Sequence, residues 1–592
     1  MPSAYHTLPA RSRVAPARSS GAESRADRGK FGHFGGFAQV NARISTRINI
    51  RINTRTKAIM LCAALLPALS ACGSGPTARV TTNSNDRLQS TRAAGNPENT
   101  GAFNGGSWWG ENAIGGGAVA DEPRAALVAR DVLANGGNAA DAAVAAYFAL
   151  AVTMPSAAGL GGGGVCLVHD AEKKTTDVFD FLPRAAKGGL VAVPGNVRGM
   201  AAINARYGKV PWAQLVSPGA NLAGTGTAIS RALANELQAA GSRLGEDPQM
   251  AAIFTKDGGA PRGETDNLRQ VDLGAALERI RVGGINEFYS GALGRSLTDA
   301  AQSIGAPLTI EDLRAAKTFV YPPASIEVGE QQLFFPASPS SGGVLAAQMV
   351  TALDGIDTGN AAAVAKAING LVADRQGWMK PGGDATKPVA DLVSSGHVSA
   401  AMDTKLDAPG AAMQENPSAT GLVTMDADGQ GVACEFTMNA PFGSARIAPG
   451  TGIILAPAPN DRGAGFSALG PIMQASNHSG RLYFLAAGGG GAPADIAKAL
   501  LFNALARQEQ PAEAAMAAGR LFADGAGTVY VEDALSGAKG ALSSAGFKVE
   551  PADKLAKVNV IYCPKSTPDD PDSCQMRNDY RGSGLAVTVA NQ

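Results

Sequence analysis

The residues that could do chemistry begin with a run of four glycines, Gly488 to Gly491. The run follows the apolar segment 482–485 and precedes a helix that we expect to open near Pro493. Backbone amides at such a strand-to-helix junction point outward together, and they can stabilise an oxyanion that develops during acyl transfer. Strand–glycine–helix turns also occur without any ligand, so the run alone identifies no function.

A second glycine-rich segment, Gly159 to Gly164, fits the pattern GxGxxG of dinucleotide-binding loops. Such a loop follows a strand and opens a helix, whereas here a helix is expected before the segment and a strand after it, at 165–168. The chain also lacks the GK[ST] sequence of a phosphate-binding loop. We therefore predict close backbone packing at a helix-to-strand turn rather than a nucleotide site.

The five His are scattered, and the motifs HExxH and GxSxG are missing from the sequence. A His-based catalytic triad and a His-rich metal site are therefore not expected. The remaining chemistry is that of hydroxyls, carboxylates and backbone amides, with no cofactor and no metal. Cys563 and Cys574 could form a disulfide across a short loop if the protein is exported.

The elements that would position these groups include two consecutive helices. Pro123 suits the first turn of a helix that we expect to reach about Ala134, where a Gly-Gly pair ends it. Asn138 then caps a second helix, with Asp141 three positions on, and its apolar composition predicts burial on most sides. Residues 355–417 show weak periodicity and predict a mobile segment before residue 418; strand periodicity follows.

The formal net charge of zero conceals two unlike parts. Residues 1–57 carry eleven basic and two acidic residues, a net of +9, so the remaining chain has a net charge of −9. A neutral chain with a pI near 7.0 argues against a nucleic-acid binder driven by bulk charge. The sequence has no run of 18 or more apolar residues that could span a membrane as a helix.

The first 112 residues predict export rather than a folded unit. Residues 1–56 predict a basic disordered leader or a mis-assigned start, and 57–72 have the layout of a secretory signal. The end of that signal, LSAC, resembles the bacterial lipobox, whose Cys, here Cys72, is lipidated after cleavage. An ordinary signal peptide with a chance Cys is the alternative. Residues 73–112 predict a flexible tether.

From about residue 113 to the C-terminus, a series of motifs resembles those of the γ-glutamyltransferases, in that family's order. They are GGNAADAAVAA, GLGGGG, AVPGNVRG, RYGKVPW, FYSGAL, LTIEDL, SPSSGG, MDADGQGVACEFTMN, PGTGIIL and NDYRGSGLA. The resemblance implies an N-terminal nucleophile hydrolase, which is a four-layer αββα sandwich of the α/β class. Such a chain cuts itself into a large subunit, here 113–418, and a small subunit, here 419–592.

In that family a Thr freed at the cut is the nucleophile, and its α-amino group is the base. It passes a γ-glutamyl group from a glutathione-like donor to water, an amino acid or a peptide. When the family's residue roles are transferred position by position, the resemblance implies that Asp461 binds the donor's α-amino group. It also implies that the backbone amides of Gly490 and Gly491 bind the oxyanion. The other matching positions of the site are Thr437, Asn439 and Ser467.

Three positions depart from the family pattern. The nucleophile position is Ala419, the second of two donor-binding serines is Ala468, and Leu182 stands where an Arg should pair with the donor α-carboxylate. Arg184 lies two residues beyond that position.

The geometry of a hairpin tests whether a neighbouring hydroxyl replaces the missing nucleophile. The segment 426–429 predicts a turn with Gly429 left-handed, so that Asp426 pairs with Gln430 and Thr437 lies opposite Ala419. A register shifted by one residue would place Thr420 or Ser418 opposite Thr437 instead.

We therefore predict γ-glutamyl transfer or hydrolysis on a small γ-glutamyl donor at the cell envelope, with Thr420 as nucleophile and Thr437 beside it. One alternative is a non-catalytic envelope binding protein on the same fold, because the nucleophile position is Ala419. Another is an amide hydrolase whose donor lacks an α-carboxylate, which would explain Leu182. The expected partners are the donor and a membrane, through the lipid anchor, and no nucleic acid.

Overall fold

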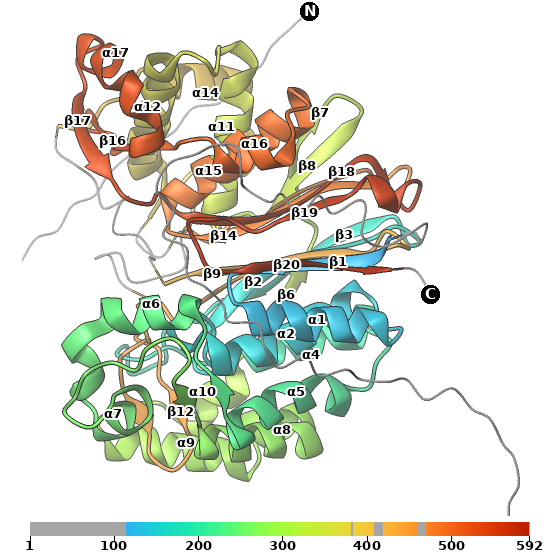
Figure 1. Ribbon diagram of the computed structural model, residues 1–592, viewed down its shortest axis with the longest axis vertical. Helices are drawn as coiled ribbons and strands as arrows, with labels where there is room; N and C mark the ends of the chain where they lie inside the picture. The colour runs from blue at the N-terminus through green and yellow to red at the C-terminus, as the bar shows by residue number, and fades with distance from the viewer. Residues whose placement is uncertain (1–113, 381–382, 408–417, 460–467, 591–592) are drawn as a thin grey trace, which may run out of the picture. The chain divides into compact units, whose positions relative to one another are not determined.

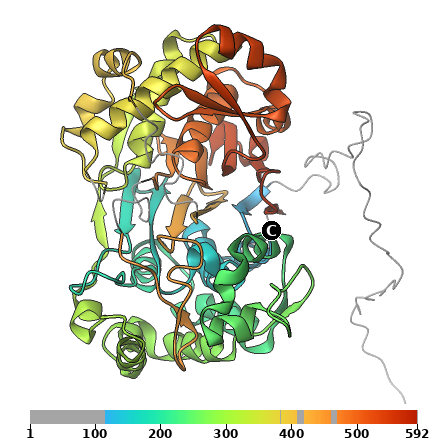
Figure 2. The ribbon, with the colours of Figure 1, turned by 90° about the vertical axis from the view of Figure 1, so that its left-hand side faces the viewer.

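A computed structural model describes residues 114–590 except 381–382, 408–417 and 460–467. Two β-sheets pack face to face, and helices cover the outer face of each sheet (Figure 1). The view turned by 90° shows the same order of layers (Figure 2). This is the four-layer αββα sandwich that the family resemblance implied. The predicted leader, signal and tether, with Cys72, lie outside the described residues.

The first sheet has the strand order β20-β1-β9-β10-β2-β3-β6, and every pair in it is antiparallel. Residues far apart in the chain thus become neighbours, because β9 pairs with β1 on one side and β10 on the other. The strands are β1 (Ile114–Ala120), β2 (Gly163–Asp170), β3 (Thr175–Phe181), β6 (Phe319–Tyr321), β9 (Thr420–Asp426), β10 (Gly431–Thr437) and β20 (Leu585–Ala590).

The second sheet has the order β19-β18-β14-β13-β8-β7, and its pairs are also antiparallel. Its strands are β7 (Ala324–Val328), β8 (Gln331–Phe335), β13 (Ile472–Ala475), β14 (Leu482–Gly489), β18 (Lys557–Thr567) and β19 (Gln575–Arg577). Apolar side chains from both sheets, including Val423, Ala433 and Leu485, fill the space between them.

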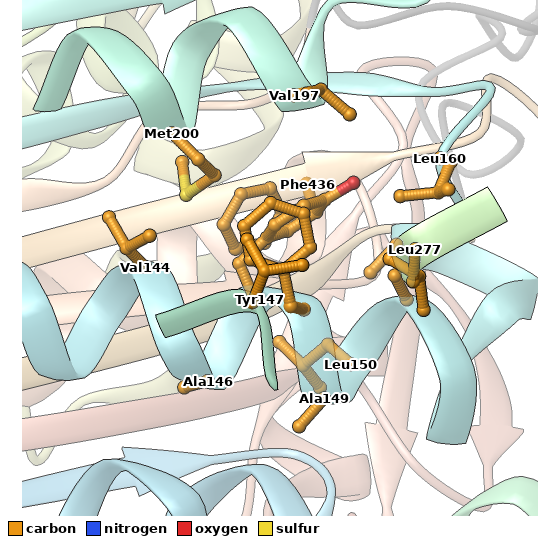
Figure 3. Close-up of a cluster of buried hydrophobic side chains, with 14 of the residues drawn as sticks. Val144, Ala146, Tyr147, Ala149, Leu150, Leu160, Val197, Met200, Leu277 and Phe436 are labelled. Atoms are coloured by element: carbon orange, nitrogen blue, oxygen red, sulfur yellow. The ribbon is translucent and has the colours of Figure 1, made fainter. Parts of the chain in front are cut away.

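The first two helices that cover the first sheet begin as the sequence predicted. Glu122 and Asn138 cap the first two of them, and Asn138 and Asp141 form a reciprocal capping box. Every residue of the second helix is buried. The centroid of its Tyr147 ring lies 5.0 Å from that of Phe436 on β10, with the two rings tilted by 40°; Figure 3 shows both side chains within the buried cluster. The longer helices of this layer are α1 (Pro123–Ala134), α2 (Ala139–Thr153), α4 (Asn196–Tyr207), α5 (Trp212–Thr225), α8 (Val271–Tyr289) and α9 (Ala292–Ser303).

The layer that covers the second sheet corrects the prediction for residues 355–417. A long helix, α12 (Ala361–Trp378), occupies much of that segment. It is buried along most of its length and rich in Ala, so it lacks the polar–apolar alternation on which the prediction relied. Residues 408–417 lie outside the described part. The other helices here are α11 (Gly342–Ala352), α13 (Val389–Leu392), α14 (Ser395–Ala401), α15 (Ala492–Phe502), α16 (Ala512–Ala517) and α17 (Lys539–Ser544).

Short elements complete the described chain. The remaining helices are α3 (Pro155–Ala158), α6 (Arg231–Ala240), α7 (Pro248–Phe254) and α10 (Ile310–Ala315). The remaining strands are β4 (Thr227–Ala228), β5 (Asn267–Leu268), β11 (Ile447–Ala448), β12 (Ile453–Ile454), β15 (Leu521–Ala523), β16 (Thr528–Glu532) and β17 (Lys548–Ala552). The first glycine run follows α3 and continues into the start of β2, and its Gly161 packs against the backbone of Ile454. Across the described segments, no helix is long and apolar enough to cross a bilayer.

Two disulfides join parts of this fold. Cys563 and Cys574 close the short loop between β18 and β19. Cys166 and Cys434 occupy directly opposed positions on β2 and β10 and form a second disulfide, which the sequence analysis did not anticipate. The two cysteines are separated by 268 positions in the sequence, so no local signal indicated their pairing.

Candidate active site

The β9–β10 hairpin has the register that the turn sequence predicted. The amide of Asp426 donates to the carbonyl of Gln430 at 3.1 Å, and Gly429 has a φ of 86°. Thr420 is paired with Phe436, so the next step of the same register places Thr437 opposite Ala419. The shifted registers that would bring Thr420 or Ser418 opposite Thr437 are not formed.

The two threonines therefore lie on different faces of the first sheet. Leu422 and Phe436 pack with the α1–α2 helix layer, whereas Ala419 and Val423 pack between the sheets. Because side chains alternate along a strand, Thr420 faces the helix layer and Thr437 faces the second sheet. The structure brings Thr420 and Thr437 to neighbouring strands, but it does not bring their hydroxyls to one face.

Thr420 has a partner of its own on the helix side. Its hydroxyl donates to Oδ2 of Asp121 at 2.9 Å, and the amide of Gly421 donates to the same oxygen at 3.1 Å. The other carboxylate oxygen of Asp121 accepts from Nδ2 of Asn559 at 2.9 Å. Thr420 is 0% exposed and Asp121 2%. A hydroxyl hydrogen-bonded to a carboxylate is the arrangement of a nucleophile beside a general base.

The second glycine run lies beside the peptide bond that joins Ala419 to Thr420. A Cβ on Gly489 would lie 2.0 Å from the carbonyl oxygen of Ala419, so only glycine permits this approach. Gly490 and Gly491 follow, between the end of β14 and the start of α15, with φ values of 125° and 70°. Their amides have no acceptor among the residues that the structure describes, as an oxyanion site requires.

A pocket of about 370 Å³ connects these groups. Asp121, Gly489 and Gly490 line it, together with charged side chains of both signs. Of these, Nζ of Lys557 lies 3.1 Å from a carboxylate oxygen of Glu236. The carboxylate that binds the Thr420 hydroxyl and part of the glycine run thus border one cavity.

On the face between the sheets, the pocket that the family resemblance implied is largely apolar. Leu182 is buried and belongs to the same hydrophobic cluster as Ala419. Arg184 does not replace the family's Arg, whose position is occupied here by Leu182. The guanidinium of Arg184 instead binds both carboxylate oxygens of Asp180, at 3.0 and 2.6 Å.

Polar groups of the family pattern do remain on this face. The hydroxyl of Thr437 accepts from the amide of Asn439 at 2.9 Å. Nδ2 of Asn439 donates to the carbonyls of Pro183 and Pro457, both at 3.0 Å. Its buried Oδ1 has no partner within the described segments. The predicted substrate contacts Asp461 and Ser467 fall outside the described residues, and Ala468 is buried.

Sequence reasoning missed Asp121 as the partner of Thr420. The position of Asp121 between an apolar segment and the helix at Pro123 was visible, but its partners Thr420 and Asn559 lie hundreds of residues away.

The described residues contain no group of three or more His, Cys, Asp or Glu side chains that could hold a metal ion.

Comparison with known proteins shows which family and which proteins this chain is similar to. The model of the gamma-glutamyltranspeptidase family matches residues 125–589. The chain is 32% identical over 377 residues to the glutathione hydrolase proenzyme of Escherichia coli, covering 56% of this chain and 64% of that protein. It is 29% identical over 377 residues to the acylase ACY 1 proenzyme of Pseudomonas sp., covering 57% of this chain and 67% of that protein.

Among solved structures, the cephalosporin acylase from Bacillus halodurans superposes with a TM-score of 0.70 at 21% identity, covering 81% of this chain and 97% of that one. This similarity concerns the fold. The match to the family model extends over most of the chain, from α1 to β20. The chain therefore belongs to the gamma-glutamyltranspeptidase family.

Proposed function

We propose that this protein transfers or hydrolyses γ-glutamyl groups of small glutathione-like donors, with Thr420 as the nucleophile. The observation that carries the proposal is the 2.9 Å hydrogen bond from the Thr420 hydroxyl to Asp121, a carboxylate that lines the same pocket as Gly490. Membership of the family supports the reaction class, and the glutathione hydrolase proenzyme of Escherichia coli is a relative.

The reaction follows from these groups. The chain would first be cut between Ala419 and Thr420, which frees the α-amino group of Thr420. In acyl transfer, Oγ1 of Thr420 attacks the acyl carbon, its proton passes to Asp121 or to the α-amino group, and the amides of Gly490 and Gly491 bind the oxyanion. The leaving amine takes the proton. Water or a second amine then cleaves the ester and restores the hydroxyl.

The test combines processing and turnover. A reducing gel of the purified protein should show two fragments, and the mass of the smaller one should place its first residue at Thr420. The protein should release the aniline from a γ-glutamyl anilide. Thr420→Ala should abolish both results. Thr424→Ala is the matched control, because its hydroxyl lies on the same strand face but donates to the carbonyl of Ala139 at 2.8 Å.

A second candidate, binding without turnover, is favoured by the register of the hairpin. Thr437 faces Ala419, so the nucleophile position of the family carries no hydroxyl, and Leu182 packs in the same cluster. In that case the gel shows one band and no aniline is released, while a γ-glutamyl compound still raises the melting temperature.

The burial of Leu182 favours a third candidate, an amide hydrolase whose donor has no α-carboxylate. A buried leucine cannot pair with a donor α-carboxylate, and the acylase ACY 1 proenzyme is among the relatives. If the protein is an amide hydrolase of this kind, it cleaves an acyl anilide without an α-carboxylate faster than the γ-glutamyl anilide. Leu182→Arg should then shift the preference toward the γ-glutamyl compound.

We also propose that the protein works at the bacterial cell envelope as a lipoprotein anchored through Cys72. The two disulfides support export, because disulfides persist in oxidising compartments. Cys72→Ser should move the protein from the membrane fraction to the soluble fraction. A Cys72→Ser protein that still sediments with membranes would argue against the anchor.

A further inference from the structure

Four charged side chains meet in the interior next to the second glycine run. Glu435 comes from β10, Asp495 and Lys498 come from α15, and Arg375 comes from α12. All four are 0–1% exposed. Removing a charge from water costs several kcal/mol per ion, and pairing offsets this cost only with good geometry. A cluster of this kind therefore stabilises a core less well than apolar side chains would. This indicates that it holds neighbouring backbone segments in position.

Glu435, on the first sheet, binds backbone amides of the second sheet and a lysine of its helix layer. One carboxylate oxygen accepts from the amide of Gly488 at 2.8 Å and from Nζ of Lys498 at 2.7 Å. The other oxygen accepts from the amide of Gly470 at 2.6 Å. Lys498 lies 3.0 Å from Asp495 and also donates to the carbonyl of Gly470 at 2.5 Å.

The charges in the cluster depend on one another. Burial opposes the charged form of Lys498, but Glu435 and Asp495 outweigh it and raise the pKa of Lys498. Burial raises the pKa of Asp495 to about 7, against the favourable charges of Lys498 and Arg375. Lys498 thus stays protonated and is the cation that pairs with the Glu435 carboxylate.

The position of this connection matters for the glycine run. β10 belongs to the first sheet and β14 to the second, and facing sheets are held together by side chains. Gly488 directly precedes Gly489, which packs on the carbonyl of Ala419. The Glu435 carboxylate therefore fixes the glycine run against the bond between Ala419 and Thr420.

We infer that Glu435, with Lys498 as its counter-charge, is a positioning residue that sets the glycine amides for self-cleavage at Ala419–Thr420 and for acyl transfer. The inference rests on the proposed function for its kinetic readout. It also has a structural readout that does not depend on activity, namely hydrogen exchange of the amides at 488–491.

The first variants test the connection directly. Glu435→Gln should slow cleavage at least tenfold, and any remaining turnover should show a lower kcat with a KM close to that of the parent protein. Deuterium uptake by the peptide containing 488–491 should be at least tenfold faster. Asp141→Asn is the matched control, because Asp141 is a buried carboxylate that binds the amides of Lys209 and Val210 elsewhere. It should leave cleavage and uptake at 488–491 within twofold.

A double variant separates position from stability. Glu435→Leu with Lys498→Met replaces the ion pair by apolar side chains, which commonly keeps or raises stability. It leaves Arg375 as the cation near Asp495, and it should fold, yet cleave at least tenfold more slowly. Cleavage at the parental rate in the double variant would overturn the inference.

If the parent protein is never cleaved, the proposed function fails and the inference is decided by exchange alone. Faster uptake at 488–491 in the double variant, but not in Asp141→Asn, then supports it. Equal uptake in the parent, the double variant and the control refutes it.

Discussion

Restoring a hydroxyl at position 419 is the most direct test of how the hairpin register governs chemistry. Ala419→Thr places a second threonine opposite Thr437, on the face between the sheets, where the family has its nucleophile. We expect cleavage to move to the bond between Ser418 and residue 419, and turnover of a γ-glutamyl anilide to rise about 10²-fold or more, the range that general-base assistance contributes.

The structural cost of this substitution can be bounded from its surroundings. Ala419 is 4% exposed within an apolar cluster, so the added methyl and hydroxyl groups should destabilise the fold by about 1–3 kcal/mol. A hydrogen bond to Thr437, its cross-strand neighbour, should return about 1 kcal/mol. The net loss of about 0–2 kcal/mol corresponds to a decrease in melting temperature of at most about 8 °C.

The assay measures fragment masses on a reducing gel, initial rates and the melting temperature together. Ala433→Thr is the control, because Ala433 is a buried alanine on the same face but lies opposite Val423. It gains no hydrogen bond to Thr437, so it should lose about 1–3 kcal/mol of stability and show no gain in rate. A folded Ala419→Thr protein with neither cleavage before residue 419 nor a tenfold gain would refute the argument that the register sets the nucleophile position.

Three further predictions concern other contacts. Asp121→Asn removes the acceptor of the Thr420 hydroxyl, so it should lower the rate of cleavage and of anilide release at least tenfold, while Thr424→Ala does not. Burial raises the pKa of Asp426 from 3.8 to about 6. Between these two values the folded protein binds a proton that the unfolded chain has released. The free energy of unfolding should therefore fall by about 3 kcal/mol as the pH rises from below 4 through 6. Urea unfolding at pH 4 and pH 7 should show this loss, and Asp426→Asn should reduce it; a parent protein whose stability is equal at both pH values would contradict it. Removing the disulfide by Cys166→Ala and Cys434→Ala should cost about 2–5 kcal/mol, measured by urea unfolding of the oxidised protein, and a loss under 1 kcal/mol would contradict it.

The sequence predicted those parts of the fold that local chemistry decides. The helix starts at Pro123 and Asn138 are set by capping groups within four residues, and the hairpin register is set by the turn that contains Gly429. The family resemblance supplied the order of layers. Helix α12 could not be predicted, because a helix buried on most sides has no polar face to reveal its period.

The parts of the site that could not be predicted depend on contacts across the chain. Asp121 meets Thr420 only because β1 and β9 are neighbours in the sheet. Glu435 lies on β10 of the first sheet, whereas its partners Gly470, Gly488 and Lys498 come from the second sheet and its helix layer. Nothing near any of these residues in the sequence indicates the other members.

The order of strands in the sheets determines what a cut at Ala419–Thr420 would leave behind. The first sheet contains strands from before and after the cut as direct neighbours, since β1 lies between β20 and β9, and β10 lies beside β2. The two fragments would remain interleaved, and the bond between Cys166 and Cys434 would join them covalently. The processed protein would therefore migrate as a single species until reductant is added, so a non-reducing gel would report an intact chain whether or not the peptide bond had been broken.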